Sequence, residues 1–189
     1  MITGHFGLAA AAKSADRRVP LWALMIATIW LDVVFAPLFA TGIEYIDPAP
    51  GTDGGYGDSI IYADYTHSLL GALLIAAVTG LVCARWWGRR GGLVIGAVVF
   101  SHWVLDLIVH RADLPLLPGN LGSLPRLGFG LWQYHIVTAI VEIVLVLLGA
   151  GLYWRAAVKT GGSRGRVNLV TVLIVAFGAV TLGLDIAGI

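Results

Sequence analysis

The residues of this chain that could do chemistry are histidines and carboxylates placed inside strongly apolar segments. An ionisable side chain in such a segment is costly unless it is paired, hydrated or bound to a metal ion, so each is a functional candidate. Neutral imidazoles and carboxylates are ligands of zinc and related divalent ions, and almost no Lys or Arg shares these segments. The candidates are Asp32, Asp64, His67, His102, Asp106, His110, His135 and Glu142.

Three of these candidates share one face of one predicted helix. His102, Asp106 and His110 are spaced i, i+4 and i+8, which aligns them in a single stripe. A lone intramembrane histidine often serves only as an interhelical hydrogen-bonding residue, and for His135 that interpretation stands beside metal ligation. Glu142 follows seven residues later on the same face and suits a partner of the ligands or a proton acceptor. The stripe indicates a shared ligand, most simply a metal ion.

The composition places these residues in an integral membrane protein. Of the 189 residues, 58% are hydrophobic and only 12% are charged, which is too little polar surface for a soluble globule. Five apolar runs have the roughly 20 residues that a membrane-spanning helix needs. They cover residues 20–41, 60–84, 91–110, 131–155 and 168–187. We therefore predict an all-α bundle of about five transmembrane helices, forming a single transmembrane domain over residues 1–189.

A shorter apolar stretch precedes the first predicted span. Residues 2–12 are too few to cross a bilayer, and basic residues follow this stretch rather than precede it, unlike a signal peptide. We expect a re-entrant helix that is retained and packed inside the bundle. The single cysteine, Cys83, excludes a thiolate zinc site, so a metal would be held by nitrogen and oxygen ligands. The net charge of +1 gives no indication of nucleic acid binding.

The basic residues predict the orientation of the chain. Ten of the twelve Lys and Arg residues lie before the first run, between the second and third, or between the fourth and fifth. The positive-inside rule makes these loops cytoplasmic, the basic N-terminal loop included, and makes the 42–59 and 111–130 loops external. In that orientation the candidate residues fall in the outer half of the membrane, where we expect one cavity to collect them.

Four short strings contain candidate residues: Gly4-His5-Phe6-Gly7, Leu31-Asp32, Thr66-His67-Ser68 and Ser101-His102-Trp103-Val104-Leu105-Asp106. In this order along the chain, they resemble the YdjM family of bacterial inner-membrane metal-dependent hydrolases. That family is in turn similar to zinc-dependent phospholipase C and the fungal zinc nucleases. The likeness covers about the first 110 residues and implies a multi-pass protein of the bacterial inner membrane, with His5, Asp32, His67, His102 and Asp106 as metal ligands.

The sequence also departs from that family at two places. Tyr62-Ala63-Asp64 stands where the family has His-Arg-Gly, and Val34 stands where it has a second Asp. The number of metal ions therefore stays open, and Asp64 or His110 could replace the missing ligands.

The expected function is hydrolysis of a lipid or isoprenoid phosphoester near the external leaflet by a metal-dependent enzyme, with zinc the favoured ion. Asp64 or Glu142 would accept the proton of the attacking water. Two alternatives stay open: a non-enzymatic accessory subunit of a membrane complex, and a metal or proton transporter. A transporter would need polar residues that continue to the cytoplasmic side, and few lie beyond Glu142. The expected partners are membrane lipids, and a homo-oligomer or a membrane complex fits as well.

Overall fold

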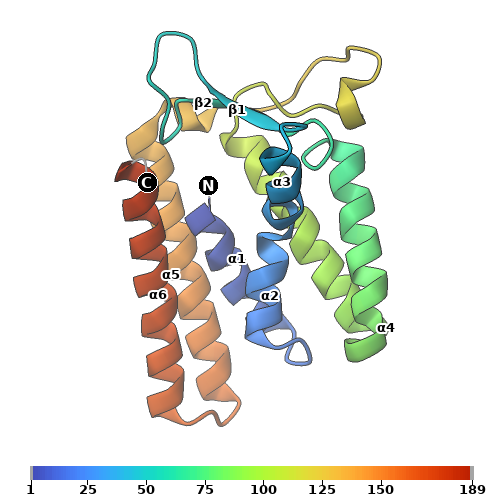
Figure 1. Cartoon of the computed structure of the whole chain (residues 1–189). Helices are drawn as coiled ribbons and strands as arrows, with labels where there is room; N and C mark the ends of the chain where they lie inside the picture. Colours follow the sequence, from blue (N-terminus) through green and yellow to red (C-terminus); the bar gives the residue numbers. More distant parts are fainter. Residues whose placement is uncertain (1, 188–189) are drawn as a thin grey trace.

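The computed structural model describes residues 2–187 and consists of helices apart from one small β-hairpin (Figure 1). The predicted all-α class is confirmed. Two 3-10 turns, η1 (Pro118–Asn120) and η2 (Leu131–Gln133), lie in the connection between α4 and α5. The other elements are α1 (Ile2–Ala15), α2 (Leu21–Thr28), α3 (Trp30–Ala40), β1 (Tyr45–Pro48), β2 (Ser59–Tyr62), α4 (Leu69–Val109), α5 (His135–Lys159) and α6 (Arg164–Ala187).

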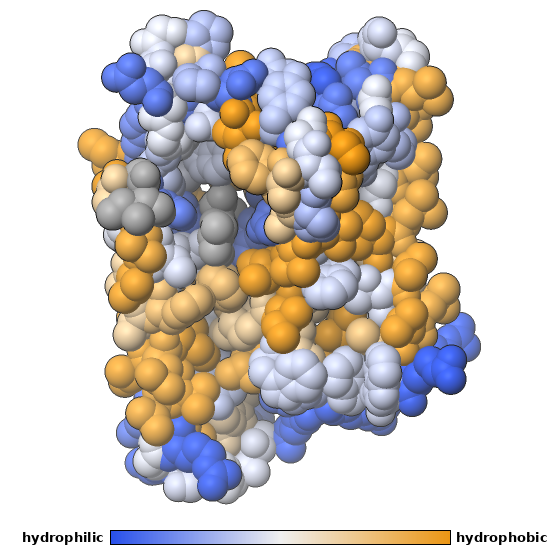
Figure 2. Space-filling model, in the orientation of Figure 1, coloured by the Kyte–Doolittle hydropathy of each residue, from blue (hydrophilic) through white to orange (hydrophobic). Residues whose placement is uncertain are grey.

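The helices α4, α5 and α6 are long and apolar enough to cross a membrane. Helices α2 and α3, bent by 46° at the break between them, would add a fourth span if they cross as one broken helix. Within the described residues this count is lower than the five spans predicted. Figure 2 shows apolar residues across the middle of the face in view, between hydrophilic ends. The membrane class predicted from composition is therefore supported by the fold.

Helix α4 is 41 residues long, but it folds back on itself at Gly88. Gly88 has a φ of 69°, in the left-handed region that glycine adopts without steric cost. In a straight helix Gly80 and Gly92 would be about 18 Å apart, whereas here a Cβ on Gly80 would lie 2.8 Å from the carbonyl oxygen of Gly92. The two arms of α4 thus run antiparallel, and small residues let their backbones approach closely (Figure 1).

Two predicted spans begin later than expected. The run predicted from residue 60 starts with β2, whose Ile60 and Ile61 pair across the hairpin with β1, and the helix begins only at Leu69. Ser68 caps this helix by accepting a hydrogen bond from the Gly71 N–H, because its extended backbone and hydroxyl suit an N-cap. Asp64 and His67 therefore lie in the loop before α4, and the prediction that they lie on a helix is wrong. The run predicted from residue 131 likewise opens with η2.

The short helix α1 packs inside the bundle, as expected. Its 14 residues extend about 21 Å, less than the roughly 30 Å of hydrocarbon in a bilayer. It lies against α5, where Gly7 meets Gly149 so closely that a Cβ on either residue would collide with the backbone of the other helix. Helix α1 begins partway along the bundle, on the side of the β-hairpin (Figure 1).

Candidate metal centre

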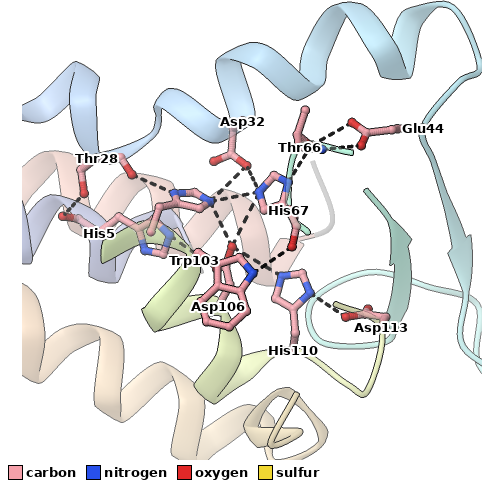
Figure 3. Close-up of polar contacts among 11 residues, drawn as sticks. His5, Thr28, Asp32, Glu44, Thr66, His67, Trp103, Asp106, His110 and Asp113 are labelled. Atoms are coloured by element: carbon pink, nitrogen blue, oxygen red, sulfur yellow. Dashed lines mark hydrogen bonds and ion pairs between the residues drawn. The ribbon is translucent and has the colours of Figure 1, made fainter. Parts of the chain in front are cut away.

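Five polar side chains converge inside the bundle, near the N-terminal end of α1 (Figure 3). They come from four segments: α1, α3, the loop before α4, and the second arm of α4. The ligand atoms of one group lie within 4.8 Å of one another, as do those of a second group, and His102 belongs to both. The first group is His5, His102 and Asp106, and the second is Asp32, His67 and His102. These are the five ligands that the motif resemblance implies.

The ligand atoms have the spacing that a small divalent cation requires. The Nε2 atoms of His67 and His102 are 3.3 Å apart, and Asp32 Oδ1 lies 3.5 Å from each. Asp106 Oδ2 lies 3.0 Å from His102 Nε2, and Asp106 Oδ1 lies 3.5 Å from His5 Nε2. Around a tetrahedral zinc ion with bonds of about 2.0–2.2 Å, ligand atoms are roughly 3.3–3.6 Å apart. The donor set therefore fits zinc without large movement.

The break between α2 and α3 orients His102. The Thr28 carbonyl lies at the end of α2, and the Nδ1 atom of His102 lies 2.8 Å from its oxygen. A carbonyl oxygen can only accept a hydrogen bond, so Nδ1 carries a proton, and in the neutral imidazole Nε2 then presents its lone pair to the cluster. An outer hydrogen bond of this kind is how proteins hold histidine in the metal-binding tautomer. The helix break thus contributes directly to the site.

His110 occupies the edge of the cluster. It caps the C-terminal end of α4, and its Nδ1 atom lies 2.9 Å from Asp113 Oδ1. Its Nε2 atom is 3.8 Å from Asp106 Oδ2, so it faces the same carboxylate as the other histidines but belongs to neither ligand group. The ring of Trp132 stacks on His110 with a centroid distance of 4.5 Å. The predicted alignment is therefore present, since His102 and His110 both face the Asp106 carboxylate.

The cluster lies in a cavity of about 500 Å³ that is short of positive charge. Asp32, Asp106 and Asp185 line it, and among the described residues no Lys or Arg does. Imidazole lone pairs and carboxylates that face one another repel unless a cation lies between them. The remaining walls are largely apolar, formed by side chains that include Phe35, Ile46, Ile61 and Trp132. Figure 2 shows this face hollowed between the α5–α6 pair and the central helices, with hydrophilic surface inside the hollow.

Asp64, predicted as a catalytic residue, is held in an ion pair. Arg126 donates to both of its carboxylate oxygens, at 2.6 and 2.9 Å, and this hydrogen bonding raises the pKa of the guanidinium. The same arginine also donates to the carbonyl of Asp113, so it joins the loop before α4 to the loop after it. Asp64 thus helps to hold the loops on either side of α4 together and does not line the cavity.

Two further candidates also lie outside the cavity lining. Glu142 is fully buried in α5, where it accepts hydrogen bonds from the Tyr56 hydroxyl at 2.7 Å and the Gly4 N–H at 3.2 Å. His135 begins α5 with its side chain 45% exposed, 3.4 Å from Asp58. The prediction that one cavity collects every candidate is therefore wrong for Asp64, His135 and Glu142. Asp64 lies in a loop and His135 at the exposed start of α5, whereas Glu142 stays in the helix with its carboxylate bonded to Tyr56 and Gly4.

The site also contains residues that sequence reasoning missed. Glu44 and Asp113 lie in the two loops predicted to be external, and neither was a candidate, yet both are buried beside the cluster. Thr28 and Thr66 contribute a carbonyl and a hydroxyl that bond to the cluster histidines. The only signal for Thr66 was its place next to His67 in the Thr-His-Ser string.

Comparison with known proteins adds no family to this description. No family model matches the chain, and no curated protein or solved structure matches it either. What the site can do therefore follows from its own donor set: buried nitrogen and oxygen ligands, a cation-sized spacing and an adjoining cavity with apolar walls.

Proposed function

We propose that this protein is a membrane-embedded, divalent-metal-dependent hydrolase of a lipid or isoprenoid phosphoester. The observation that carries this proposal is the buried cluster of three imidazoles and two carboxylates beside a cavity with largely apolar walls. Zinc is the favoured ion because it prefers such ligands in a compact geometry. The motif likeness to the YdjM family supports the same chemistry. Placement of the cluster in the outer half of the bundle favours a substrate drawn from the external leaflet.

Each residue of the site has a defined task in this proposal. Asp32, His67 and His102 would hold a metal ion, and Asp106 with His5 extends the ligand set. A divalent cation would supply Lewis-acid activation of a phosphoryl group and of water. The side chains of Phe35 and Trp132 would receive apolar parts of the substrate and exclude bulk water from the cluster.

The proton acceptor of the reaction differs from the two residues first considered. Asp64 has both oxygens engaged by Arg126, and Glu142 is engaged by Tyr56 and Gly4. Asp32 is the better candidate, because only its Oδ1 atom faces the cluster histidines, which leaves the second carboxylate oxygen on a side chain that is 39% exposed and lines the cavity. A general base must lie within hydrogen-bonding reach of the water that it deprotonates, and Asp32 meets that condition at the cluster.

The proposed topology has five membrane passes. The broken α2–α3 pair, the two arms of α4, α5 and α6 each provide one pass, and α1 enters only partway. Most of the basic residues lie near three turns: the loop after α1, the Gly88 turn and the α5–α6 turn. These three turns therefore face the cytoplasm of a bacterial inner membrane. The β-hairpin and the α4–α5 connection then face outward and cover the site. Beneath the cluster the core consists of apolar side chains such as Leu24, Ile95 and Val99, which disfavours a transport path.

Cysteine labelling should confirm this orientation. In a Cys83→Ala background, an impermeant thiol reagent added outside intact cells should label Asp53→Cys and Ser123→Cys but not Arg89→Cys. All three positions are exposed, so differences in labelling report sidedness rather than burial. Permeabilised cells provide the control, because all three variants should then react. The opposite pattern would overturn the orientation and the leaflet assigned to the substrate.

The function itself is tested by hydrolysis. Purified protein in liposomes should release phosphate or a phosphorylated headgroup from a lipid phosphoester panel, and a chelator should abolish the release. Activity should return when zinc is restored. Chelator-insensitive release would point to a contaminating enzyme, and no release from any lipid on the panel by zinc-loaded protein would reject the hydrolase.

A further inference from the structure

Glu44 is a buried carboxylate whose hydrogen bonds all come from the loop that carries His67. It follows α3 and is fully buried. Its Oε1 atom accepts hydrogen bonds from the backbone N–H groups of Tyr65 and Thr66, at 2.7 and 2.9 Å. Its Oε2 atom accepts one from the Thr66 hydroxyl at 2.9 Å. A buried carboxylate is costly, and three donors aimed at it offset that cost.

The Thr66 hydroxyl connects Glu44 to the cluster. Its oxygen lies 2.9 Å from His67 Nδ1 as well as 2.9 Å from Glu44 Oε2 (Figure 3). A carboxylate can only accept, so the hydroxyl proton points to Glu44 and the hydroxyl oxygen accepts from His67 Nδ1–H. In the neutral imidazole, His67 Nε2 is then left without a proton and faces Asp32 and His102. The charge of Glu44 thus sets the direction of both hydrogen bonds.

We propose that Glu44 is a positioning residue that fixes the His67 tautomer through Thr66 and thereby sets the metal affinity of the site. This inference rests on the metal site of the proposed function. His102 differs, because a backbone carbonyl orients it and no side-chain replacement reverses that bond. Partners of this outer kind typically change metal affinity by about 10–100-fold. At His67, by contrast, the Glu44 side chain determines which ring nitrogen carries the proton.

Glu44→Gln should reverse the hydrogen-bond direction at nearly constant volume. The amide oxygen would keep the two backbone N–H bonds, which places the amide NH₂ against the Thr66 hydroxyl. The hydroxyl must then donate to His67 Nδ1, and the imidazole proton moves to Nε2, the atom that faces the cluster. A flipped amide would instead direct its NH₂ at two backbone N–H donors. The variant should therefore keep its fold and bind metal about 10–100-fold more weakly.

Two measurements separate this effect from general damage. ¹⁵N NMR of metal-free protein with labelled histidines should show the His67 proton on Nδ1 in the wild type and on Nε2 in Glu44→Gln, with the signal assigned by its loss in His67→Gln. Co²⁺ titration followed by visible absorption gives the affinity. Thr66→Ser retains the hydroxyl and should behave as the wild type, whereas Thr66→Val should lose affinity as Glu44→Gln does. In the Thr66→Val background, Glu44→Gln should add little further loss, because the connection is already broken.

The outcomes distinguish this inference from the proposed function. A wild type that binds no metal would reject the metal site, while the NMR comparison would still decide the tautomer. A wild type that binds Co²⁺ as tightly as Glu44→Gln, with the proton on Nδ1 in both, would overturn the role of Glu44 and leave the metal site standing. If Glu44→Gln does not fold, equal Co²⁺ affinity in Thr66→Val and Thr66→Ser would overturn it instead.

Discussion

Replacing His102 with alanine is expected to remove the metal ion from the purified protein. Its Nε2 atom belongs to both ligand groups and lies 3.0–3.5 Å from the ligand atoms of Asp106, His67 and Asp32. Without this imidazole each ligand group loses a member, so the site should lose much of its affinity for the metal ion. Elemental analysis after gel filtration should find stoichiometric metal in the wild type and almost none in His102→Ala.

His135→Ala provides the matched control for this experiment. It also removes one imidazole, but its side chain is half-exposed and pairs with Asp58 outside the cluster. Full metal content is therefore expected in His135→Ala. Equal metal content in His102→Ala and His135→Ala would contradict the site, as would a folded wild type that contains no metal.

Asp106→Asn should abolish hydrolysis while the protein stays folded. Asp106 is buried at the centre of the site, where its two oxygens face the Nε2 atoms of His5 and His102. The amide has nearly the same shape, yet it lacks the negative charge and binds a cation poorly. Loss of even an outer partner of a metal ligand costs about 10–100-fold, so loss of this carboxylate should lower turnover by more than about 100-fold. The release of phosphate or headgroup from liposomes measures the effect.

Asp53→Asn is the matched control, because it removes the same charge from an exposed position between the two strands. Its turnover should equal that of the wild type, and circular dichroism should show unchanged helix content in both variants. If wild type and Asp106→Asn were equally inactive on a broad lipid-phosphate panel while metal stayed bound, the cluster would be a structural metal site in an accessory subunit.

The sequence alone determined the class of the protein and the centre of its site. Apolar runs predict membrane helices because hydropathy is a local property of the chain. His102 and Asp106 could be paired from their spacing, since residues four apart share a face of any α-helix. The motif likeness added His5, Asp32 and His67, which the fold brings to the same place. The membrane class and the shared helix face could be predicted because the information for each lies within one short stretch of the chain.

Only the tertiary structure decided which other polar residues join the site. Asp64 and Glu44 are both acidic residues near predicted helix ends, yet Asp64 is paired with Arg126 and Glu44 is bonded to the His67 loop. The hydrogen-bond donors to these two carboxylates lie 62 and 22 residues away in the sequence, and no local pattern specifies them. The same is true of Thr28, whose carbonyl orients a histidine 74 residues away, at the break between α2 and α3. A buried polar group must find a partner, and only the folded chain determines which partner lies within reach.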